Sequence, residues 1–258
     1  MTPAFDAAVF DLDGVVTFTA RIHAAAWKQV FDEFLGARAR ATGSAFQPFT
    51  DDEYRAYVDG RPRRDGIRTF LAARKIGLPE GTMELAPNVW TIEGIARRKD
   101  EAFRRRLRQN GVPVDRDAVE FIRSLRAHDI AIGAASSSRN ARLVLHVGGI
   151  ADLFDACTDG ITIDRLGLPG KPAPDLFLAC LEQLGIRDPG RAFVAEDAQA
   201  GVEAGRRARF GLVLGVDRGG NAKALYEHGA DLVIESFRGL SFERIDAWFR
   251  KRHREHCA

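Results

Sequence analysis

Cysteine is scarce in this sequence, and long apolar runs are missing. The three cysteines, at positions 157, 180 and 257 of 258, are widely spaced and form no Cys-x-x-Cys pair. This number and spacing exclude a disulfide scaffold and a structural zinc site and favour a reducing compartment, so we expect a cytoplasmic protein. No apolar stretch approaches the ~20 residues of a membrane-spanning helix, and residues 1–6 lack the basic and apolar regions of a signal peptide.

A large excess of charge of either sign is also missing. The chain has 38 basic and 36 acidic residues, a formal net charge of +2, so no global field draws it onto nucleic acid or an anionic membrane. We expect neither as a partner. With 45% hydrophobic residues, the sequence can bury a substantial core, and its length fits one large domain or a core with a second, smaller domain.

Short apolar runs followed by small or polar residues recur along the chain. They cover residues 7–10, 130–135, 192–195 and 212–214, with 232–234 as a fifth candidate. Between them, apolar residues spaced by three and four positions, such as Val119, Ile122 and Leu125, predict helices. Strands that alternate with helices predict an α/β fold, in which a doubly wound parallel sheet has helices on both faces.

Residues 19–108 show helical spacing without a convincing strand. One amphipathic helix is predicted by the pattern from Trp27 to Leu35 and another by Ile67, Phe70 and Leu71, while residues 36–48 read as a loop. The sequence therefore predicts a helical domain of residues 19–108, inserted into a core formed by residues 1–18 and 109–258.

Polar residues follow the first two predicted strands, where parallel sheets place their ligands. Asp11 and Asp13 can face one cavity, one as nucleophile or metal ligand and the other as proton donor, although Asp-x-Asp-Gly is also a common turn. Residues 136–140, Ser-Ser-Ser-Arg-Asn, offer hydroxyls, amides and a helix N-terminus to an anion; an ordinary helix cap is the alternative.

Two further polar elements complete the series. Lys171 stands ahead of a proline-started helix, where it can neutralise a phosphoryl group or lie in an ordinary surface turn. Glu196 and Asp197 follow the third strand; adjacent carboxylates suit Mg²⁺, and an acidic first helical turn is the alternative. Because all four elements occur in this order, we interpret them as one site.

These residues resemble a known family over essentially the whole chain. Phe10-Asp11-Leu12-Asp13-Gly14-Val15-Val16, Ser136, Lys171-Pro172 and Glu196-Asp197 resemble the four motifs of the haloacid dehalogenase superfamily. Within it, Thr17-x-Thr19-x3-His23-x3-Trp27-Lys28, Ser136-x-Ser138-Arg139-Asn140, Lys171-Pro172-Ala173-Pro174-Asp175 and Glu196-Asp197-x-Gln199-Ala200-Gly201 resemble the β-phosphoglucomutase family. The resemblance implies a Rossmann-like α/β core with an inserted α-helical cap that closes over the site.

The resemblance also implies roles for the residues of the core. Asp11 is implied as the nucleophile that forms an aspartyl phosphate, and Asp13 as the general acid and base. Ser136 and Lys171 are implied to bind the transferring phosphoryl group. The implied cofactor is Mg²⁺, held by Asp11, the main-chain carbonyl of Asp13, Glu196 and Asp197.

Substrate contacts are implied for the cap and for the segment after the second strand. Arg63 occupies the position that grips the substrate's other phosphate, with the register against Arg61 or Arg64 open. Lys99 lies in line with a buried stripe at helical spacing; a snorkelling surface lysine is the alternative. His23 and Thr19 stand where the family has its hinge and acid-orienting residues, although a histidine beside Trp27 is equally typical of ordinary helix packing. The remaining implied substrate-binding residues are Thr19, Trp27, Ser138, Arg139 and Asn140.

The implied activity is the conversion of β-D-glucose 1-phosphate to glucose 6-phosphate through an aspartyl-phosphate enzyme and a bisphosphate. The partner is then a small sugar phosphate, and we expect a monomer. The alternatives are a sugar-phosphate phosphatase, with water as acceptor, and a non-catalytic phospho-acceptor module, which the insertion at 19–108 disfavours. Phe18 in place of an acidic residue, Gly66 in place of a serine, and the extra residues 37–50 bear on which sugar is bound.

Overall fold

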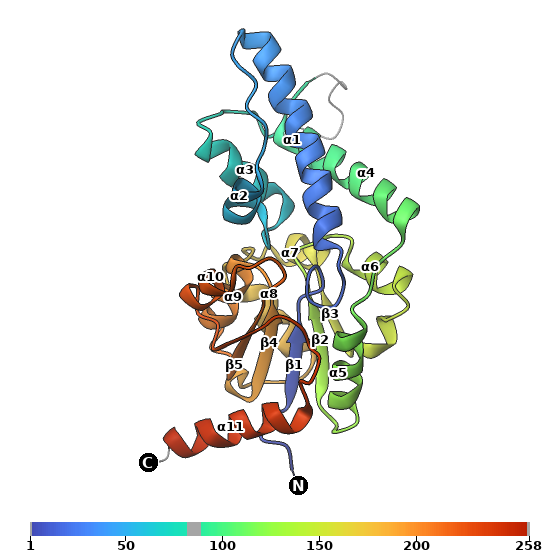
Figure 1. Ribbon diagram of the computed structural model, residues 1–258, viewed down its shortest axis with the longest axis vertical. Coiled ribbons are helices and arrows are strands. Elements are labelled where there is room, and N and C mark those ends of the chain that lie inside the picture. Colours follow the sequence, from blue (N-terminus) through green and yellow to red (C-terminus); the bar gives the residue numbers. More distant parts are fainter. Residues whose placement is uncertain (1, 82–88, 257–258) are drawn as a thin grey trace. The chain divides into compact units, whose positions relative to one another are not determined.

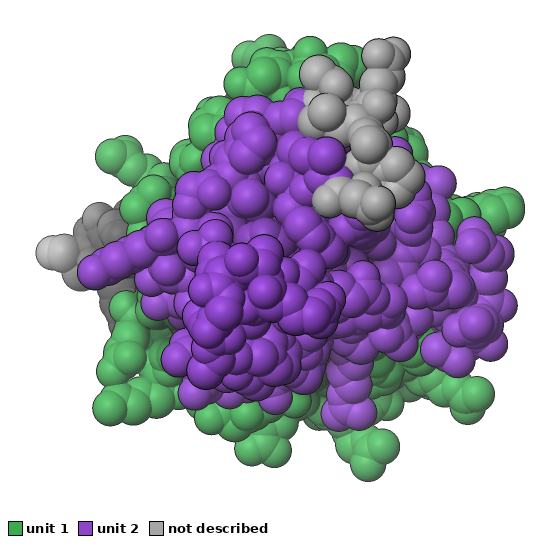
Figure 2. All heavy atoms as spheres, turned by 90° about the horizontal axis from the view of Figure 1, so that it is seen from above, with its two compact units in different colours: residues 1–18, 112–258 green, residues 19–111 purple. Residues whose placement is uncertain are grey.

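The computed structural model describes residues 2–81 and 89–256, with the side chains of residues 2–81 and 89–252. It divides the chain into two compact units, coloured separately in Figure 2. Unit 1 comprises Met1–Phe18 and Val112–Ala258, and unit 2 comprises Thr19–Gly111. Cys157 and Cys180 are free thiols in unit 1, whereas Cys257 lies outside the described residues.

Unit 1 contains a six-stranded parallel sheet, which confirms the predicted α/β fold (Figure 1). Five of its strands were predicted from the sequence, and β3 was not, because its sequence Ala-Cys-Thr lacks the Val, Ile, Leu and Phe residues that mark the other runs. The sheet order β3-β2-β1-β4-β5-β6 places β1 between β2 and β4, so the connections reverse direction beside β1. The strands are β1 Ala7–Phe10, β2 Ala131–Ala135, β3 Ala156–Thr158, β4 Ala192–Glu196, β5 Leu212–Val216 and β6 Leu232–Ile234.

Helices cover both faces of this sheet because successive strand residues point to opposite sides. Ala8 and Phe10 belong to one buried cluster, with residues of α5, α6 and α11. Ala7 and Val9 belong to a second, with residues of α7, α8, α9 and α10. The helices are α5 Arg116–Arg126, α6 Ala141–Val147, α7 Gly160–Leu166, α8 Asp175–Gln183, α9 Gln199–Arg207, α10 Ala222–Glu227 and α11 Phe242–His256; short 3₁₀ turns lie at Ala151–Leu153 and Pro189–Arg191.

In its described residues, unit 2 is helical, with aromatic rings at its centre. Phe31 of α1 packs against Phe70 of α3, with 4.3 Å between ring centroids, and Phe49 packs edge-on against Phe70 at 4.9 Å. Trp27 stacks on Phe31 at 5.1 Å. The elements are α1 Ala20–Thr42, α2 Asp51–Glu53, a π-helical turn at Tyr54–Val58, α3 Arg63–Ala73 and α4 Ile92–Asn110.

The loop predicted for residues 36–48 is wrong in its first half. Helix α1 continues through Gly36 to Thr42 and ends at Gly43, whose φ of +67° is the usual helix-ending conformation. A single glycine costs a helix about 1 kcal/mol relative to alanine. The alanines and arginines of residues 37–41 are strong helix formers, and they outweigh that cost.

The close approach of α8 to β2 gives a test of the packing in unit 1. A Cβ on Gly133 would lie 2.4 Å from Sγ of Cys180 and 3.1 Å from Cδ1 of Leu184. We predict that Gly133→Ala lowers the free energy of unfolding by ~1–3 kcal/mol, the usual cost of overpacking, as measured by urea denaturation. Gly219→Ala is the control, since its Cβ meets no atom within 4 Å. Equal stability of both variants would contradict this packing.

Candidate active site

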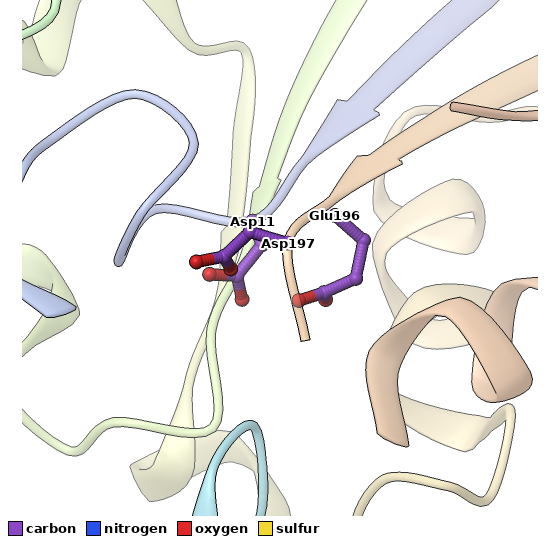
Figure 3. A group of neighbouring side chains, drawn as sticks. All are labelled: Asp11, Glu196 and Asp197. Atoms are coloured by element: carbon purple, nitrogen blue, oxygen red, sulfur yellow. The ribbon is translucent and has the colours of Figure 1, made fainter. Parts of the chain in front are cut away.

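Three carboxylates converge at the carboxyl ends of β1 and β4. Asp11 directly follows β1, Glu196 is the last residue of β4, and Asp197 comes next in the chain. Figure 3 shows the three side chains gathered at these strand ends. Each offers a ligand oxygen, and these oxygens lie within 4.8 Å of one another. The sheet order, which makes β1 and β4 neighbours, therefore assembles an acidic cluster from distant parts of the sequence.

Lys171 is the positive charge of this cluster. Its side chain is fully buried, and Nζ donates to Oδ1 of Asp11 at 2.7 Å and to Oε2 of Glu196 at 2.7 Å. A third hydrogen bond, of 3.2 Å, goes to the carbonyl of Ala135 at the end of β2. The ring of Phe177 lies beneath the ammonium group, at 4.6 Å. All three ammonium protons thus have acceptors, and two of these acceptors are carboxylates.

Asp13 and Ser136 are joined to the same cluster. The backbone N–H of Asp13 donates to Oδ2 of Asp11 at 2.9 Å, and the hydroxyl of Ser136 donates to Oδ2 of Asp13 at 3.0 Å. Ser136 in turn accepts a hydrogen bond from the backbone N–H of Ser138 at 3.1 Å. The residues that follow β1, β2 and β4 therefore form one hydrogen-bonded group with Lys171.

Two glycines leave the space that the acidic side chains occupy. Gly14 has a φ of +102°, and a Cβ there would lie 1.8 Å from Oδ2 of Asp197. A Cβ on Gly201 would lie 2.0 Å from Cδ of Glu196. Both glycines belong to the motifs that resemble the family, Gly14 directly after Asp13 and Gly201 five residues after Glu196. This position in the motifs is the sequence signal for their role.

The electrostatics of the cluster favour a cation. Burial, together with Glu196 and Asp13, raises the pKa of Asp11 to about 8, although Lys171 opposes this shift. Burial lowers the pKa of Lys171, but Asp11 and Glu196 outweigh it and hold that pKa above its ordinary value. Three ionised carboxylates and one ammonium leave two negative charges, which a divalent cation neutralises. Carboxylate oxygens are the ligands that Mg²⁺ prefers, so the donor set fits this ion.

The segment after β2 uses its polar groups locally. The hydroxyl of Ser138 accepts a hydrogen bond from the backbone N–H of Asn140 at 3.2 Å, and Asn140 is buried. The guanidinium of Arg139 pairs with Asp164 of α7. These contacts fix the loop that presents Ser136.

Unit 2 holds a buried lysine among aromatic rings. Lys99 of α4 is 3% exposed, and its Nζ lies 2.5 Å from Nδ1 of His23. The ring centroids of Trp27 and Phe103 lie 5.2 and 4.9 Å from the same nitrogen. Thr19, which is buried ahead of α1, accepts the backbone N–H of His23 through its carbonyl at 2.9 Å. The structure thus brings into one group four of the five unit 2 residues that the resemblance implies as substrate contacts, namely Thr19, His23, Trp27 and Lys99.

Arg63 lies at the start of α3, and its side chain reaches α4. Its guanidinium donates to Oδ1 of Asp100 at 2.6 Å and to the carbonyl of Ala96 at 3.3 Å. The neighbouring Arg64 pairs instead with Glu93 at 2.8 Å. Arg63 therefore contacts the residue next to Lys99, whereas Arg64 binds Glu93, about two helical turns earlier on α4.

Comparisons with known proteins agree on one family. The model of the haloacid dehalogenase-like hydrolases matches residues 5–209. A β-phosphoglucomutase of Mycobacterium bovis is 40% identical over 232 residues, covering 88% of each chain, and a fructose-1-phosphate phosphatase of Escherichia coli is 28% identical over 206 residues, covering 80% and 93%. A solved structure of β-phosphoglucomutase from Clostridium difficile is similar, with a TM-score of 0.75 and 25% identity, covering 96% of this chain and 98% of the other.

Within the described parts of the chain, none of the helices combines the length and the apolar character needed to span a bilayer.

The raised pKa of Asp11 predicts how the metal-free protein responds to pH. The ordinary pKa of an aspartate carboxyl is 3.8, and burial raises the pKa of Asp11 to about 8, so between these pH values the folded state holds a proton that the unfolded chain has lost. The free energy of unfolding therefore falls as the pH rises through this range. Mg²⁺ binds the ionised carboxylates, so its stabilising effect should grow over the same range.

Urea unfolding with EDTA and with Mg²⁺, at several pH values from 5 to 8, measures both effects. The variant Asp11→Asn, which has no proton to titrate at this position, should lose much of the pH dependence. The same slope in the variant and in the native sequence would contradict the assignment of the shift to Asp11.

Proposed function

Because the chain belongs to the haloacid dehalogenase-like hydrolase family, we propose that it is a Mg²⁺-dependent phosphosugar mutase. The proposed reaction converts β-D-glucose 1-phosphate to glucose 6-phosphate through an aspartyl phosphate and glucose 1,6-bisphosphate. The observation that carries this proposal is a second set of cations, Arg63 and Lys99 in unit 2, besides Lys171 in unit 1. A mutase must hold two phosphates, whereas a phosphatase needs to hold one.

In the proposed first half-reaction, the C6 hydroxyl of the sugar attacks the phosphorus of phosphorylated Asp11. The new oxygen–phosphorus bond forms as the bond to the Asp11 carboxylate breaks, and Asp13 takes the hydroxyl proton. Ser136 supports this role of Asp13, because its hydroxyl donates to Oδ2 and orients the carboxylate. The products are glucose 1,6-bisphosphate and a free Asp11 carboxylate.

The second half-reaction transfers the other phosphoryl group. After the bisphosphate has turned over in the site, Asp11 attacks the phosphorus at C1, and the bond from that phosphorus to the C1 oxygen breaks. Asp13 returns its proton to this oxygen, which gives glucose 6-phosphate and phosphorylated Asp11. The ammonium of Lys171, which lies 2.7 Å from Oδ1 of Asp11, is placed to hold a phosphoryl oxygen during both transfers.

The metal site of the proposal consists of Asp11, Glu196, Asp197 and the main-chain carbonyl of Asp13. Bound Mg²⁺ supplies positive charge that screens the repulsion between the Asp11 carboxylate and the phosphoryl group. The clustered carboxylate oxygens and the surplus of negative charge support this assignment.

Unit 2 supplies the proposed contacts to the second phosphate. The ammonium group of Lys99 is a buried positive charge in unit 2, and such a charge attracts an anionic ligand more strongly than a solvated one does. Arg63 presents a planar guanidinium that suits bidentate binding of phosphate, after exchange of its present partner Asp100. His23 and Trp27 surround Lys99 and support its position.

A sugar-phosphate phosphatase is the second candidate, in which water replaces the sugar hydroxyl as acceptor. It is favoured by the name of the Escherichia coli relative, a fructose-1-phosphate phosphatase. Gly66, at the position where a substrate-contacting serine is expected, bears on which sugar is bound in either reaction. A Cβ at Gly66 would lie 3.3 Å from Cα of Val58, so α3 packs against the main chain there and leaves little room for a serine.

A coupled assay separates the two candidates. The purified protein receives β-D-glucose 1-phosphate, Mg²⁺ and a trace of glucose 1,6-bisphosphate, and glucose 6-phosphate and free phosphate are followed in the same tube. We expect glucose 6-phosphate with little free phosphate, and no product with Asp11→Asn. Release of phosphate without isomerisation would refute the mutase and support the phosphatase.

Arg63→Ala tests whether a second phosphate is held in unit 2. Loss of one partner of a buried charged pair costs ~2–5 kcal/mol, so kcat/KM of the mutase reaction should fall about 30-fold or more. Hydrolysis of p-nitrophenyl phosphate, which has one phosphate, should change little. Arg64→Ala is the matched control, because it removes the same charge one residue away and breaks a comparable pair with Glu93. Equal losses in both assays would contradict the role of Arg63.

A further inference from the structure

An arginine outside the sequence motifs holds the turn that follows Asp13. Arg218 lies just after β5, and its Nε donates to the carbonyl of Gly14 at 2.7 Å. One of its terminal nitrogens, Nη2, donates to the carbonyl of Val15 at 3.0 Å and pairs with the carboxylate of Asp115. The side chain is 20% exposed. One guanidinium therefore binds two consecutive carbonyls of the turn and a fixed carboxylate.

The turn from Asp13 to Thr17 has little freedom of its own. Gly14 donates its backbone N–H to the carbonyl of Thr17 at 2.7 Å, and Thr17 pairs with Asp13 in a short β-bridge. Gly14 also adopts a positive φ against the side chain of Asp197. Since Asp13 directly precedes these carbonyls, their position determines where its carboxylate points.

Arg218 also contacts both places where the chain passes between the units. Its guanidinium carbon lies 5.0 Å from the ring centroid of Phe18, the last residue before unit 2. Asp115 stands three residues after Val112, where the chain re-enters unit 1. The two segments are bonded to each other, because Phe18 donates its N–H to the carbonyl of Pro113 at 2.8 Å. Movement of either segment would therefore displace a side chain that contacts Arg218, either Phe18 or Asp115.

We propose that Arg218 is a positioning residue for Asp13: its guanidinium fastens the turn that carries the general acid and base to the two crossing segments of unit 1. The inference rests on the proposed function, in which Asp13 transfers a proton to and from the sugar oxygen. Arg218 itself takes no part in that transfer. The geometry requires arginine, because the amine of lysine has no planar fork to reach both carbonyls and the carboxylate.

A poorly positioned Asp13 has a kinetic signature that general instability lacks. A sugar alkoxide is a poor leaving group and needs the proton of Asp13, whereas p-nitrophenolate leaves without one. A loss of positioning therefore lowers kcat/KM for the sugar phosphate far more than for p-nitrophenyl phosphate. Asp13→Asn provides the reference for this selectivity.

The experiment compares Arg218→Gln and Arg218→Lys with the native chain, with Mg²⁺ present and with thermal unfolding midpoints recorded. We expect kcat/KM for β-D-glucose 1-phosphate to fall roughly tenfold to a hundredfold in both variants, with little change in kcat/KM for p-nitrophenyl phosphate. Arg126→Gln is the matched control. It also removes an arginine of unit 1 that binds a carboxylate, Asp155 at 2.8 Å, and a carbonyl, that of Leu153 at 3.1 Å, and it should alter neither rate.

The results distinguish the positioning role of Arg218 from the proposed role of Asp13 on which it rests. Equal losses for both substrates in the Arg218 variants, with selective loss in Asp13→Asn, would overturn the role of Arg218 and leave the proposed function intact. The absence of selectivity in Asp13→Asn would overturn both. If Arg218→Gln does not fold, Arg218→Lys keeps the charge and carries the same comparison.

Discussion

The ammonium of Lys171, shared between Asp11 and Glu196, is the interaction on which the site depends. It also binds the carbonyl of Ala135, so a single side chain fastens the carboxyl ends of β1, β2 and β4. Removing one partner of a buried pair is costly, about 3–5 kcal/mol, because the remaining charge is then uncompensated. Lys171 therefore stabilises the strand ends, and in the proposed function it also holds a phosphoryl oxygen, so we expect its replacement to lower both stability and activity.

The carboxylates of Asp11, Glu196 and Asp197 concentrate negative charge at the site where the proposed substrate would bring its phosphate. Gly14 and Gly201 let Asp197 and Glu196 come closer than any other residues would allow, and burial raises the pKa of Asp11. In a metal-free protein such a cluster is destabilising at neutral pH. The two large apolar clusters on the faces of the sheet fix the strand order and so hold these charged side chains together at the strand ends. We interpret this loss of stability in the metal-free protein as the consequence of clustering carboxylates that can bind a cation.

The sequence was informative where structure follows from local pattern, and less so elsewhere. Five of six strands, and the placing of Asp11 and Glu196 at their ends, followed from apolar runs that end in polar residues. Lys171 was assigned to the same site from the order of the four polar elements along the chain. The strand β3 was missed because Ala-Cys-Thr lacks large apolar residues, and the helix through Gly36 because one glycine was taken as the start of a loop. Arg218 could not be found, since its partners lie more than a hundred residues away and its motif-free surroundings give no signal.

In the proposed function, unit 1 carries out the phosphoryl transfer and unit 2 selects the substrate. With the roles proposed above, the carboxylates and Lys171 of unit 1 would serve any phosphoryl transfer through an aspartate, so they would not by themselves select a sugar. Unit 2 has 18 basic and 12 acidic residues, whereas the rest of the chain has 20 and 24. An excess of positive charge favours a substrate with two phosphates over one with a single phosphate. Because Gly66 and residues 37–50 also belong to unit 2, we expect the identity of the sugar to be decided there.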